Sequence, residues 1–369
     1  MEHTDWPFSS NAIRLSLREW GWAVLICVIA CLLIPVAWSG MEKYEPGADY
    51  RLPYRISDDY WMFERWCEQS SAEYPFLVLG DSVMWGQYVK SEHTLAHFLN
   101  EQAGKEVFAN LGLDGIHPIA MAGLIRYYGK GIKNKAVVLH LNPLWMSSKK
   151  HDLQTDEEFR FNHPRLVPQV YPDLPCYNPT FPEIVDIVAE RRVPFFTWMR
   201  HMKAVYFENM AIHDWTMQYP CKNPLGVIDF KVPAPENEPK SSPVSWGERG
   251  IIEQEFPWIQ PESSQQYASF REVMEILTAR GNRIFVLIGP MNTHLLTKGS
   301  RARYNEIKSE IERRLEKDGI PFLSAHDLHS EHYADASHPL REGYSRIARE
   351  LFASNVFRKW MKESNGGKK

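Results

Sequence analysis

An uninterrupted apolar segment near the N-terminus constrains this chain more than any other feature. From Trp20 to Trp38 there are 19 consecutive residues without a charge, WGWAVLICVIACLLIPVAW. About 20 such residues cross the hydrocarbon core of a bilayer as one helix, and tryptophans at both ends suit the membrane interface. We therefore expect residues 20–38 to be a single transmembrane anchor.

The charges around this segment predict its orientation. Two arginines precede it, and two glutamates with a lysine follow it: Arg14 and Arg18, then Glu42, Lys43 and Glu45. Basic residues favour the cytoplasmic side of a membrane. We therefore expect residues 1–19 in the cytoplasm and residues 40–369 outside it, in a periplasmic or extracellular space. The lipid bilayer is thus one expected partner.

Two other interpretations of the segment remain open. Ala37, Trp38 and Ser39 fit the small-x-small pattern of a cleaved signal peptide, although the segment is longer than the usual apolar part of one. A helix buried in a protein core would also be apolar on all sides.

The composition indicates a folded protein attached to this anchor. Hydrophobic residues make up 44% of the 369 residues and charged residues 24%, which excludes overall disorder. A mean hydropathy of −0.39 excludes a polytopic membrane protein. The net charge of −4 creates no field that attracts polyanions, so we expect no nucleic-acid partner.

Short apolar runs alternate with helical patterns after residue 75. The runs predict strands at 76–79, 107–111, 136–141, 284–288 and 321–324. The helical patterns cover 92–103, 118–130, 264–280, 301–318 and 341–353. Buried strands separated by helices are typical of a parallel sheet with helices on both faces. We therefore predict an α/β domain.

This rhythm also predicts the domain organisation. Residues 40–75 are expected to be a linker and lead-in, with aromatic residues clustered at their end. The α/β domain is expected over residues 76–361, and the tail at 362–369 is expected to be disordered.

The rhythm breaks over residues 146–262, where 15 of the 25 prolines lie. Such a long and aromatic segment indicates an insertion packed on the carboxyl edge of the sheet, either lining a binding cleft or acting only as a structural cap. It contains Cys176 and Cys221, which in an oxidising compartment could form a disulfide or stay unpaired.

The first chemical signal is the sequence Gly80-Asp81-Ser82, directly after the apolar run at 76–79. Ser82 is expected at the carboxyl end of a strand, where open α/β sheets bind ligands. The N–H groups of a following helix would point to the same place and suit an oxyanion. Taken alone, the tripeptide also fits a plain strand–helix turn.

The second signal is Asp335-Ala336-Ser337-His338 in a polar loop before the last helix. An aspartate three residues before a histidine can fold back and orient the imidazole. A serine hydroxyl is a poor nucleophile until such a base takes its proton. Ser82, His338 and Asp335 therefore form a candidate catalytic triad.

A third signal follows the second predicted strand, in the segment from Asn110 to Gly115. A glycine in this loop can present its N–H to a tetrahedral oxyanion, and Gly115 is the candidate. A role only in shaping the loop is the open alternative.

Together, these three blocks resemble the SGNH (GDSL) hydrolase superfamily. The resemblance covers roughly residues 75–145 and 265–355 and leaves the anchor and the insertion outside. It implies a flavodoxin-like three-layer α/β/α sandwich. It also implies a serine esterase, lipase or acyltransferase without a metal or an organic cofactor.

The resemblance also assigns roles to individual residues. Ser82 resembles the nucleophile, His338 the base, Asp335 its orienting acid and Gly115 an oxyanion donor. The family's third block, Gly-x-Asn-Asp, is altered here, because Leu144 stands where its asparagine is expected. Asn142 either substitutes as an oxyanion donor or caps the end of the strand.

Three motifs together resemble the DltD-type branch of the superfamily: Pro143-Leu144-Trp145 after the third strand, Gly289-Pro290-Met291-Asn292 after a later strand, and the C-terminal Asp-x-x-His-Pro. This branch has one membrane helix and an extracytoplasmic domain. Its members work beside a membrane-bound O-acyltransferase, and related proteins serve O-acetylation of alginate and cellulose. The resemblance therefore implies acyl transfer to or from a cell-envelope polysaccharide through acyl-Ser82. A non-catalytic accessory protein that docks on the acyltransferase and presents the polymer is the alternative.

A rival site is a histidine cluster in the loop before the triad histidine. His326, His329 and His332 recur every three residues, beside Asp327 and Asp335. Imidazoles and carboxylates can bind a metal, but the same residues fit a polar loop that flanks an active site. We expect no metal and no cofactor.

Overall fold

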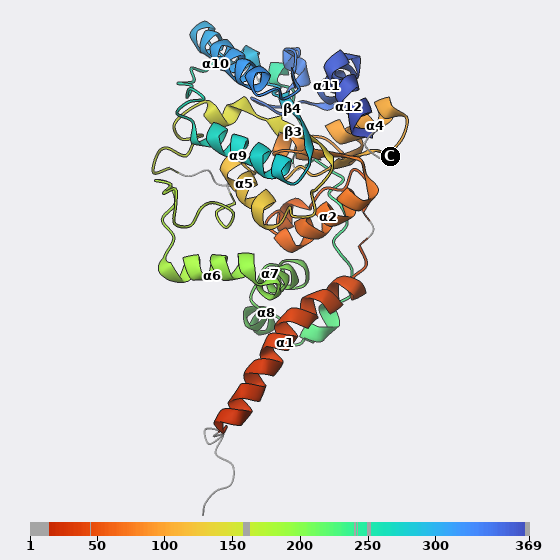
Figure 1. The fold of residues 1–369 in the computed structure, drawn as a ribbon, viewed down its shortest axis with the longest axis vertical. Helices are drawn as coiled ribbons and strands as arrows, with labels where there is room; N and C mark the ends of the chain where they lie inside the picture. Colours follow the sequence, from red (N-terminus) through yellow and green to blue (C-terminus); the bar gives the residue numbers. More distant parts are fainter. Residues whose placement is uncertain are drawn as a thin grey trace, which may run out of the picture.

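A five-stranded parallel sheet forms the centre of the molecule (Figure 1). The computed structural model describes residues 15–365, except 45, 158–162, 240, 242 and 249–251. The strands are β1 (Phe76–Leu79), β2 (Phe108–Asn110), β3 (Ala136–Leu141), β4 (Arg283–Ile288) and β5 (Phe322–Ser324). All pairs are parallel, in the order β2-β1-β3-β4-β5, which is a common order of doubly wound sheets. The predicted parallel sheet is confirmed.

Successive side chains of each strand enter two separate cores. In β1, Leu77 and Leu79 join one core while Phe76 and Val78 join the other, because strand side chains alternate. The first core is covered by α2 (Tyr60–Glu73), α5 (Pro118–Tyr127), α9 (Gln265–Ala279) and α10 (Lys298–Lys317). The second is covered by α4 (Leu95–Ala103), α11 (Arg341–Ala353) and α12 (Asn355–Asn365). This sheet domain is compatible with a three-layer α/β/α fold.

Two segments differ from their prediction. Residues 40–75 are not a simple linker, because they contain α2, whose Trp66 is buried and donates its indole N–H to the carbonyl of Asn110 at 2.7 Å. At the other end, residues 362–365 belong to α12 and are helical, because the aromatic side chains of that helix join the second core. Residues 366–369 lie outside the described residues.

The apolar N-terminal segment forms one long helix, α1 (Leu17–Met41), which contains the predicted span 20–38. Ser16 and Glu19 cap its first turn reciprocally. The helix is long and apolar enough to cross a membrane, and only 11% of its most apolar stretch of 18 residues is buried. Residues 1–14, part of the expected cytoplasmic N-terminus, lie outside the described residues.

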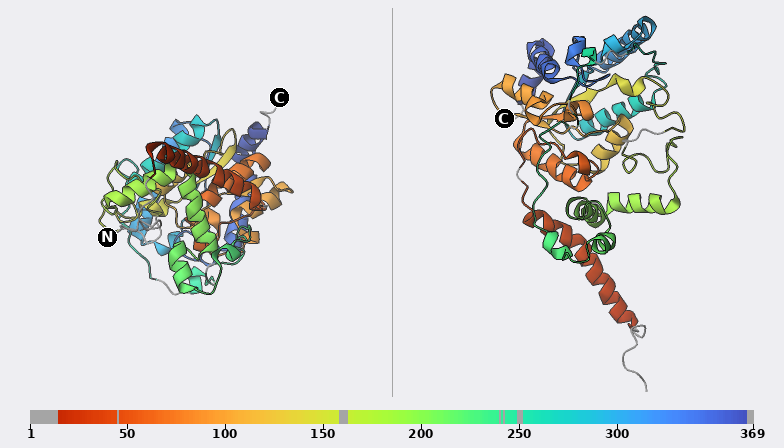
Figure 2. Two further views of the ribbon diagram at one scale, coloured as in Figure 1. Left: turned by 90° about the horizontal axis from the view of Figure 1, so that it is seen from below. Right: turned by 180° about the vertical axis from the view of Figure 1, so that it is seen from behind.

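The insertion at 146–262 contains no strand among its described residues. It carries α6 (Phe181–Arg192), α7 (Pro194–Tyr206) and α8 (Ile212–Gln218). These three helices, here called the insertion layer, lie between the sheet domain and the N-terminal part of α1 (Figures 1 and 2). No disulfide joins Cys176 and Cys221.

A buried group of charged residues joins α1 to the rest of the chain. The ring of His201, on α7, contacts Asp59 through Nδ1 at 2.8 Å and Glu42 through Nε2 at 2.9 Å. Tyr206 and Arg65 also donate to Glu42, and the side chains of His201, Asp59 and Glu42 have no exposed surface. These five residues are called the junction cluster below.

Candidate active site

The nucleophile candidate lies on a sharp turn at the carboxyl end of β1. Ser82 is the first residue of the short helix α3 (Ser82–Trp85), and Asp81 caps it by accepting the N–H of Val83 at 3.0 Å. Tyr344 donates its hydroxyl to the carbonyl of Val83 at 2.6 Å and ties the turn to α11. Ser82 is 8% exposed, so the nucleophile candidate is largely buried.

The structure brings together the three residues of the predicted triad. Nε2 of His338 lies 2.8 Å from Oγ of Ser82, although 256 residues separate them in the chain. Nδ1 of His338 lies 2.8 Å from both carboxylate oxygens of Asp335. This geometry suits a ring that carries its proton on Nδ1 and accepts the serine proton on Nε2.

The electrostatics of the pair favour a charged Asp335 and a basic His338. Burial favours the neutral acid, but the charge and hydrogen bond of His338 and the N–H groups of Ser337 and His338 outweigh it and lower the pKa of Asp335 to about 2. Burial also disfavours an imidazolium, but the carboxylate of Asp335 outweighs this effect and raises the pKa of His338. Asp81 and Asp114 add to the increase.

The loop after β2 lies against the nucleophile turn. A Cβ on Gly112 would come within 2.3 Å of the backbone nitrogen of Trp85, so only glycine allows this close approach. Gly115, the oxyanion candidate, has a φ of +72°, a conformation that glycine adopts without strain. Asn110 holds the two segments together by donating to the carbonyl of Met84 at 3.0 Å and accepting the N–H of Gly112 at 2.9 Å.

Asn142 lies in the site, but its amide has other partners. Its Nδ2 donates to Oδ2 of Asp81 at 2.8 Å and to Oγ of Ser337 at 3.3 Å. Its Oδ1 accepts the N–H of Leu144 at 3.1 Å and caps a short 3₁₀ turn over Pro143–Met146. The structure therefore displays the capping role for Asn142.

The carboxylate of Asp81 connects several side chains at the base of the site. No sequence motif predicted these contacts. The carboxylate contacts Nδ1 of His140 at 3.1 Å and accepts the indole N–H of Trp145 at 3.0 Å, in addition to the amide of Asn142. Burial opposes its charge, but His140 and Asn142 lower the pKa of Asp81 to about 2. His140 lies on β3 at the level of the nucleophile turn. From this position, its contact with Asp81 could have been predicted.

Arg51 and Tyr88 are two further residues that no motif indicated. Arg51 is 1% exposed, and its guanidinium donates to the carbonyls of Trp85, Gly86 and Val89 at and just after the end of α3. The ring of Tyr88 packs edge-on against His338, with centroids 5.3 Å apart. Both come from segments without a recognisable pattern.

The rival histidine cluster is dispersed. His326 pairs with Glu350, and the rings of His329 and His332 meet edge to face at 5.7 Å. Within the described ranges, no group of three or more His, Cys, Asp or Glu side chains is arranged to hold a metal ion.

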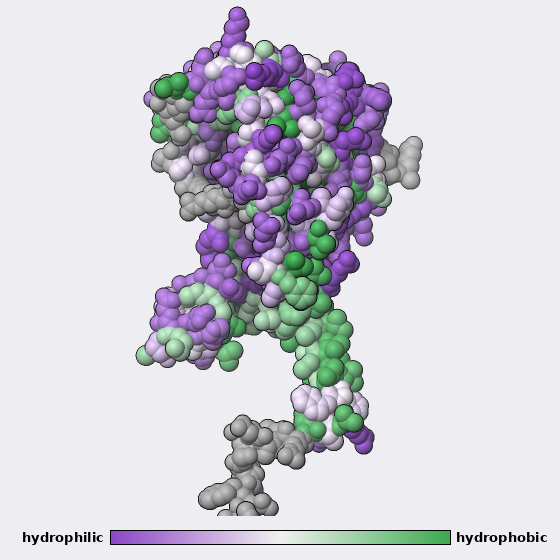
Figure 3. Space-filling view, turned by 90° about the vertical axis from the view of Figure 1, so that its left-hand side faces the viewer, coloured by the Kyte–Doolittle hydropathy of each residue, from purple (hydrophilic) through white to green (hydrophobic). Residues whose placement is uncertain are grey.

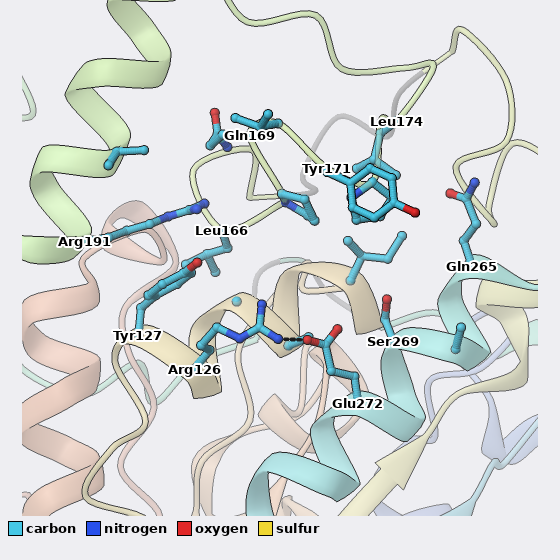
Figure 4. Close-up of a pocket in the computed structure, with 18 residues that line it drawn as sticks. Arg126, Tyr127, Leu166, Gln169, Tyr171, Leu174, Arg191, Gln265, Ser269 and Glu272 are labelled. Atoms are coloured by element: carbon cyan, nitrogen blue, oxygen red, sulfur yellow. Dashed lines mark hydrogen bonds and ion pairs between the residues drawn. The ribbon is translucent and has the colours of Figure 1, made fainter.

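The insertion forms one wall of a cavity of about 630 Å³ between α5 and α9 (Figure 4). Its charged groups are already paired, since Arg126 contacts Glu272 and the guanidinium of Arg191 lies 4.6 Å from the ring centre of Tyr127. Tyr171, from the insertion, is one of the residues that line the cavity. None of the triad residues lines this cavity.

No protein-family model matches this chain, and neither does any curated protein. The geometry of Ser82, His338 and Asp335 is therefore the basis for a functional proposal.

Proposed function

We propose that this chain is a membrane-anchored, extracytoplasmic serine esterase or O-acyltransferase of the SGNH type, with a flavodoxin-like domain. The observation that carries the proposal is the contact of 2.8 Å between Ser82 Oγ and His338 Nε2, with Asp335 on the opposite ring nitrogen. Acyl transfer through a serine requires a nucleophile, a base in contact with it and an acid that orients the base.

In this mechanism, Ser82 Oγ attacks the carbonyl carbon of an ester while Nε2 of His338 takes the hydroxyl proton. Asp335 holds the Nδ1 proton and stabilises the imidazolium. The N–H groups of Ser82 and Gly115 stabilise the oxyanion. His338 then gives its proton to the leaving alcohol, and acyl-Ser82 remains.

A hydroxyl acceptor completes the reaction by attacking acyl-Ser82, with His338 again as base. Water as acceptor gives an esterase, and a sugar hydroxyl gives a transferase. An anchor with the domain outside the cytoplasm favours a cell-envelope polysaccharide and a partner that supplies acyl groups from the membrane, such as a membrane-bound O-acyltransferase.

The test is covalent labelling of the full chain, in detergent or nanodiscs, with a fluorophosphonate probe. We expect one adduct on Ser82 that is absent in Ser82→Ala and strongly reduced in His338→Ala. Ser309→Ala, which removes an exposed serine on α10, is the matched control and should label like the unmodified protein. No Ser82-dependent adduct on folded protein would overturn the catalytic proposal.

A second candidate is a non-catalytic accessory protein that presents the polymer to a membrane acyltransferase. The observation that favours it is the amide of Asn142, which is directed to Asp81 and Ser337. The two candidates differ in turnover of a chromogenic acetyl ester. Turnover that requires Ser82 supports the enzyme, whereas polymer binding that survives Ser82→Ala without any turnover supports the accessory protein.

A further inference from the structure

Large exposed apolar side chains are concentrated on two neighbouring parts of the molecule. One part is α1 with the residues that flank it, and the other is the insertion. Outside α1 and its flanks, every large exposed apolar side chain of the described residues except Val356 lies between residues 170 and 252, in the insertion. The sheet domain therefore covers its apolar residues well, whereas the insertion does not.

Several of these exposed side chains lie on the insertion layer and on the turn that follows it. Phe181, Met217 and Leu225 are 77%, 82% and 76% exposed. Phe181 and Val185 are four residues apart on α6 and share one face of that helix, and Val185 is 51% exposed. Water is a poor environment for such a group of side chains.

The insertion layer packs directly on the end of α1. The ring of Trp38 contacts Trp198 and Tyr206 of α7, with centroids 5.5 and 6.0 Å apart, and Phe230 at 4.8 Å. Figure 3 shows α1 as a hydrophobic column that extends from a mostly hydrophilic body. The insertion layer is therefore fixed beside the C-terminal part of α1.

The length of α1 places its contact with the insertion layer at the edge of a bilayer. Pro35 and Trp38 are buried by the rest of the chain, and residues 17–34 are the part before this contact. At 1.5 Å per residue, these residues span about 27 Å, close to the roughly 30 Å of a bilayer core.

We propose that the insertion layer rests on the lipid surface around α1, with Phe181, Met217 and Leu225 inserted in the membrane interface. Lipid is the occupant because these exposed apolar side chains belong to helices on the side of the sheet domain from which α1 extends toward a bilayer (Figures 1 and 2). The layer and the junction cluster then give the sheet domain two attachments and hold Ser82 at a constant height above the membrane. The proposal requires that α1 spans the bilayer and does not depend on catalysis by Ser82.

The test uses the full chain in nanodiscs of phosphatidylcholine and phosphatidylglycerol, with no other protein present. A phosphatidylcholine with a photoreactive diazirine near its headgroup labels residues at the interface, and mass spectrometry maps them. We expect labels on α6, on α8 and around Leu225, several-fold above those at Val356 on α12. Labels confined to α1 would overturn the proposal, and would mean that another partner covers this face.

Charged substitutions supply a second measurement. Phe181→Asp combined with Met217→Asp should remove the labels from the insertion layer and leave those on α1, while Val356→Asp should change nothing. Unchanged labelling of the layer in the double variant contradicts the proposal. Reactivity of Ser82 with the fluorophosphonate probe is scored separately, so failure of the membrane proposal and failure of the catalytic proposal are distinguishable.

Discussion

Asp335 holds its position and its charge through contacts on both sides of the carboxylate. Oδ1 accepts the N–H groups of Ser337 and His338, each at 3.0 Å, while both oxygens lie against Nδ1 of His338. The backbone of Asp335 is held in turn, because Asn292 donates to its carbonyl at 3.2 Å. The imidazole of His338 is therefore held by a carboxylate that is itself held by the backbone and by Asn292.

The pH dependence of ester turnover should follow from this contact. The active form of His338 is neutral, and its pKa is raised above the ordinary value of 6.5. Activity should therefore increase with pH through an inflection above 6.5. In Asp335→Asn the imidazolium loses its counter-charge, so the inflection should move to lower pH and kcat should fall by about 10³–10⁴-fold.

The measurement is kcat/KM for a chromogenic ester between pH 5 and 9. Asp318→Asn, at the exposed end of α10, is the matched control and should leave the profile unchanged. An inflection that stays in place in Asp335→Asn would show that Asp335 does not set the basicity of His338.

The three triad residues could be identified from the sequence because each belongs to a short local pattern. Ser82 follows an apolar strand, and Asp335 and His338 are close enough in the chain to meet in one turn. The partners of Asn142 could not be identified, because they depend on the packing of β3 beside the nucleophile turn and on the loop that carries Ser337. Asp81 follows β1, the strand that neighbours β3, and no spacing along the chain indicates its contact with Asn142.

At the scale of elements, α3 is held by an arginine that enters from outside the helix. α3 is only four residues long, and Arg51 satisfies the carbonyls just beyond its end. The carbonyl of Gly86 also accepts the N–H of Val89, but the loss of Arg51 removes the buried side-chain donor that all three carbonyls share.

Arg51→Met should therefore lower the free energy of unfolding by about 2–4 kcal/mol. It should also reduce the rate of fluorophosphonate labelling, because the turn that carries Ser82 loosens. Arg303→Met, which breaks an exposed ion pair with Glu255, should cost about 1 kcal/mol or less. Thermal unfolding of the full chain measures both. Equal costs for the two variants would refute a positioning role for Arg51.

The junction cluster connects three elements, α1, α2 and α7, through one imidazole. Burial disfavours a charge on the imidazole of His201, but the carboxylates of Asp59 and Glu42 outweigh this effect and raise the pKa of His201 to about 9. The carboxylate of Glu42 is also buried, yet His201, Tyr206 and Arg65 lower its pKa to about 2. The cluster is therefore charged at neutral pH.

His201→Phe leaves two buried carboxylates without their shared partner and should cost about 3–5 kcal/mol of unfolding free energy. Since the pKa of His201 is raised on folding, its contribution is complete below pH 6.5 and disappears as the pH rises through about 9. Unfolding of the full chain between pH 6 and 10 measures this loss. His213→Phe, an 81% exposed histidine on α8, is the control and should leave the profile unchanged. The prediction fails if His201→Phe and the unmodified protein lose stability in parallel above pH 8.

At the scale of the whole molecule, the orientation of α1 decides which compartment contains Ser82. With Arg14 and Arg18 before the apolar segment 20–38, we expect the N-terminus in the cytoplasm and the sheet domain outside. Alkaline phosphatase fused after Lys369 should be active in a bacterial host, and the same enzyme fused before Met1 should be inactive. Activity of the fusion before Met1 together with inactivity of the fusion after Lys369 would show the opposite topology.

The apolar segment, the parallel sheet and the two local motifs that carry the triad residues were determined by the sequence alone, because each depends on residues close together in the chain. Apolar length defines a span, continuous apolar runs define buried strands, and the spacing in Asp-x-x-His defines a turn. The structure alone decided that residues 40–75 join the core, that Asn142 serves Asp81, and that the insertion forms a layer on α1. These features depend on side chains far apart in the sequence, which meet only when the sheet and its helices have packed.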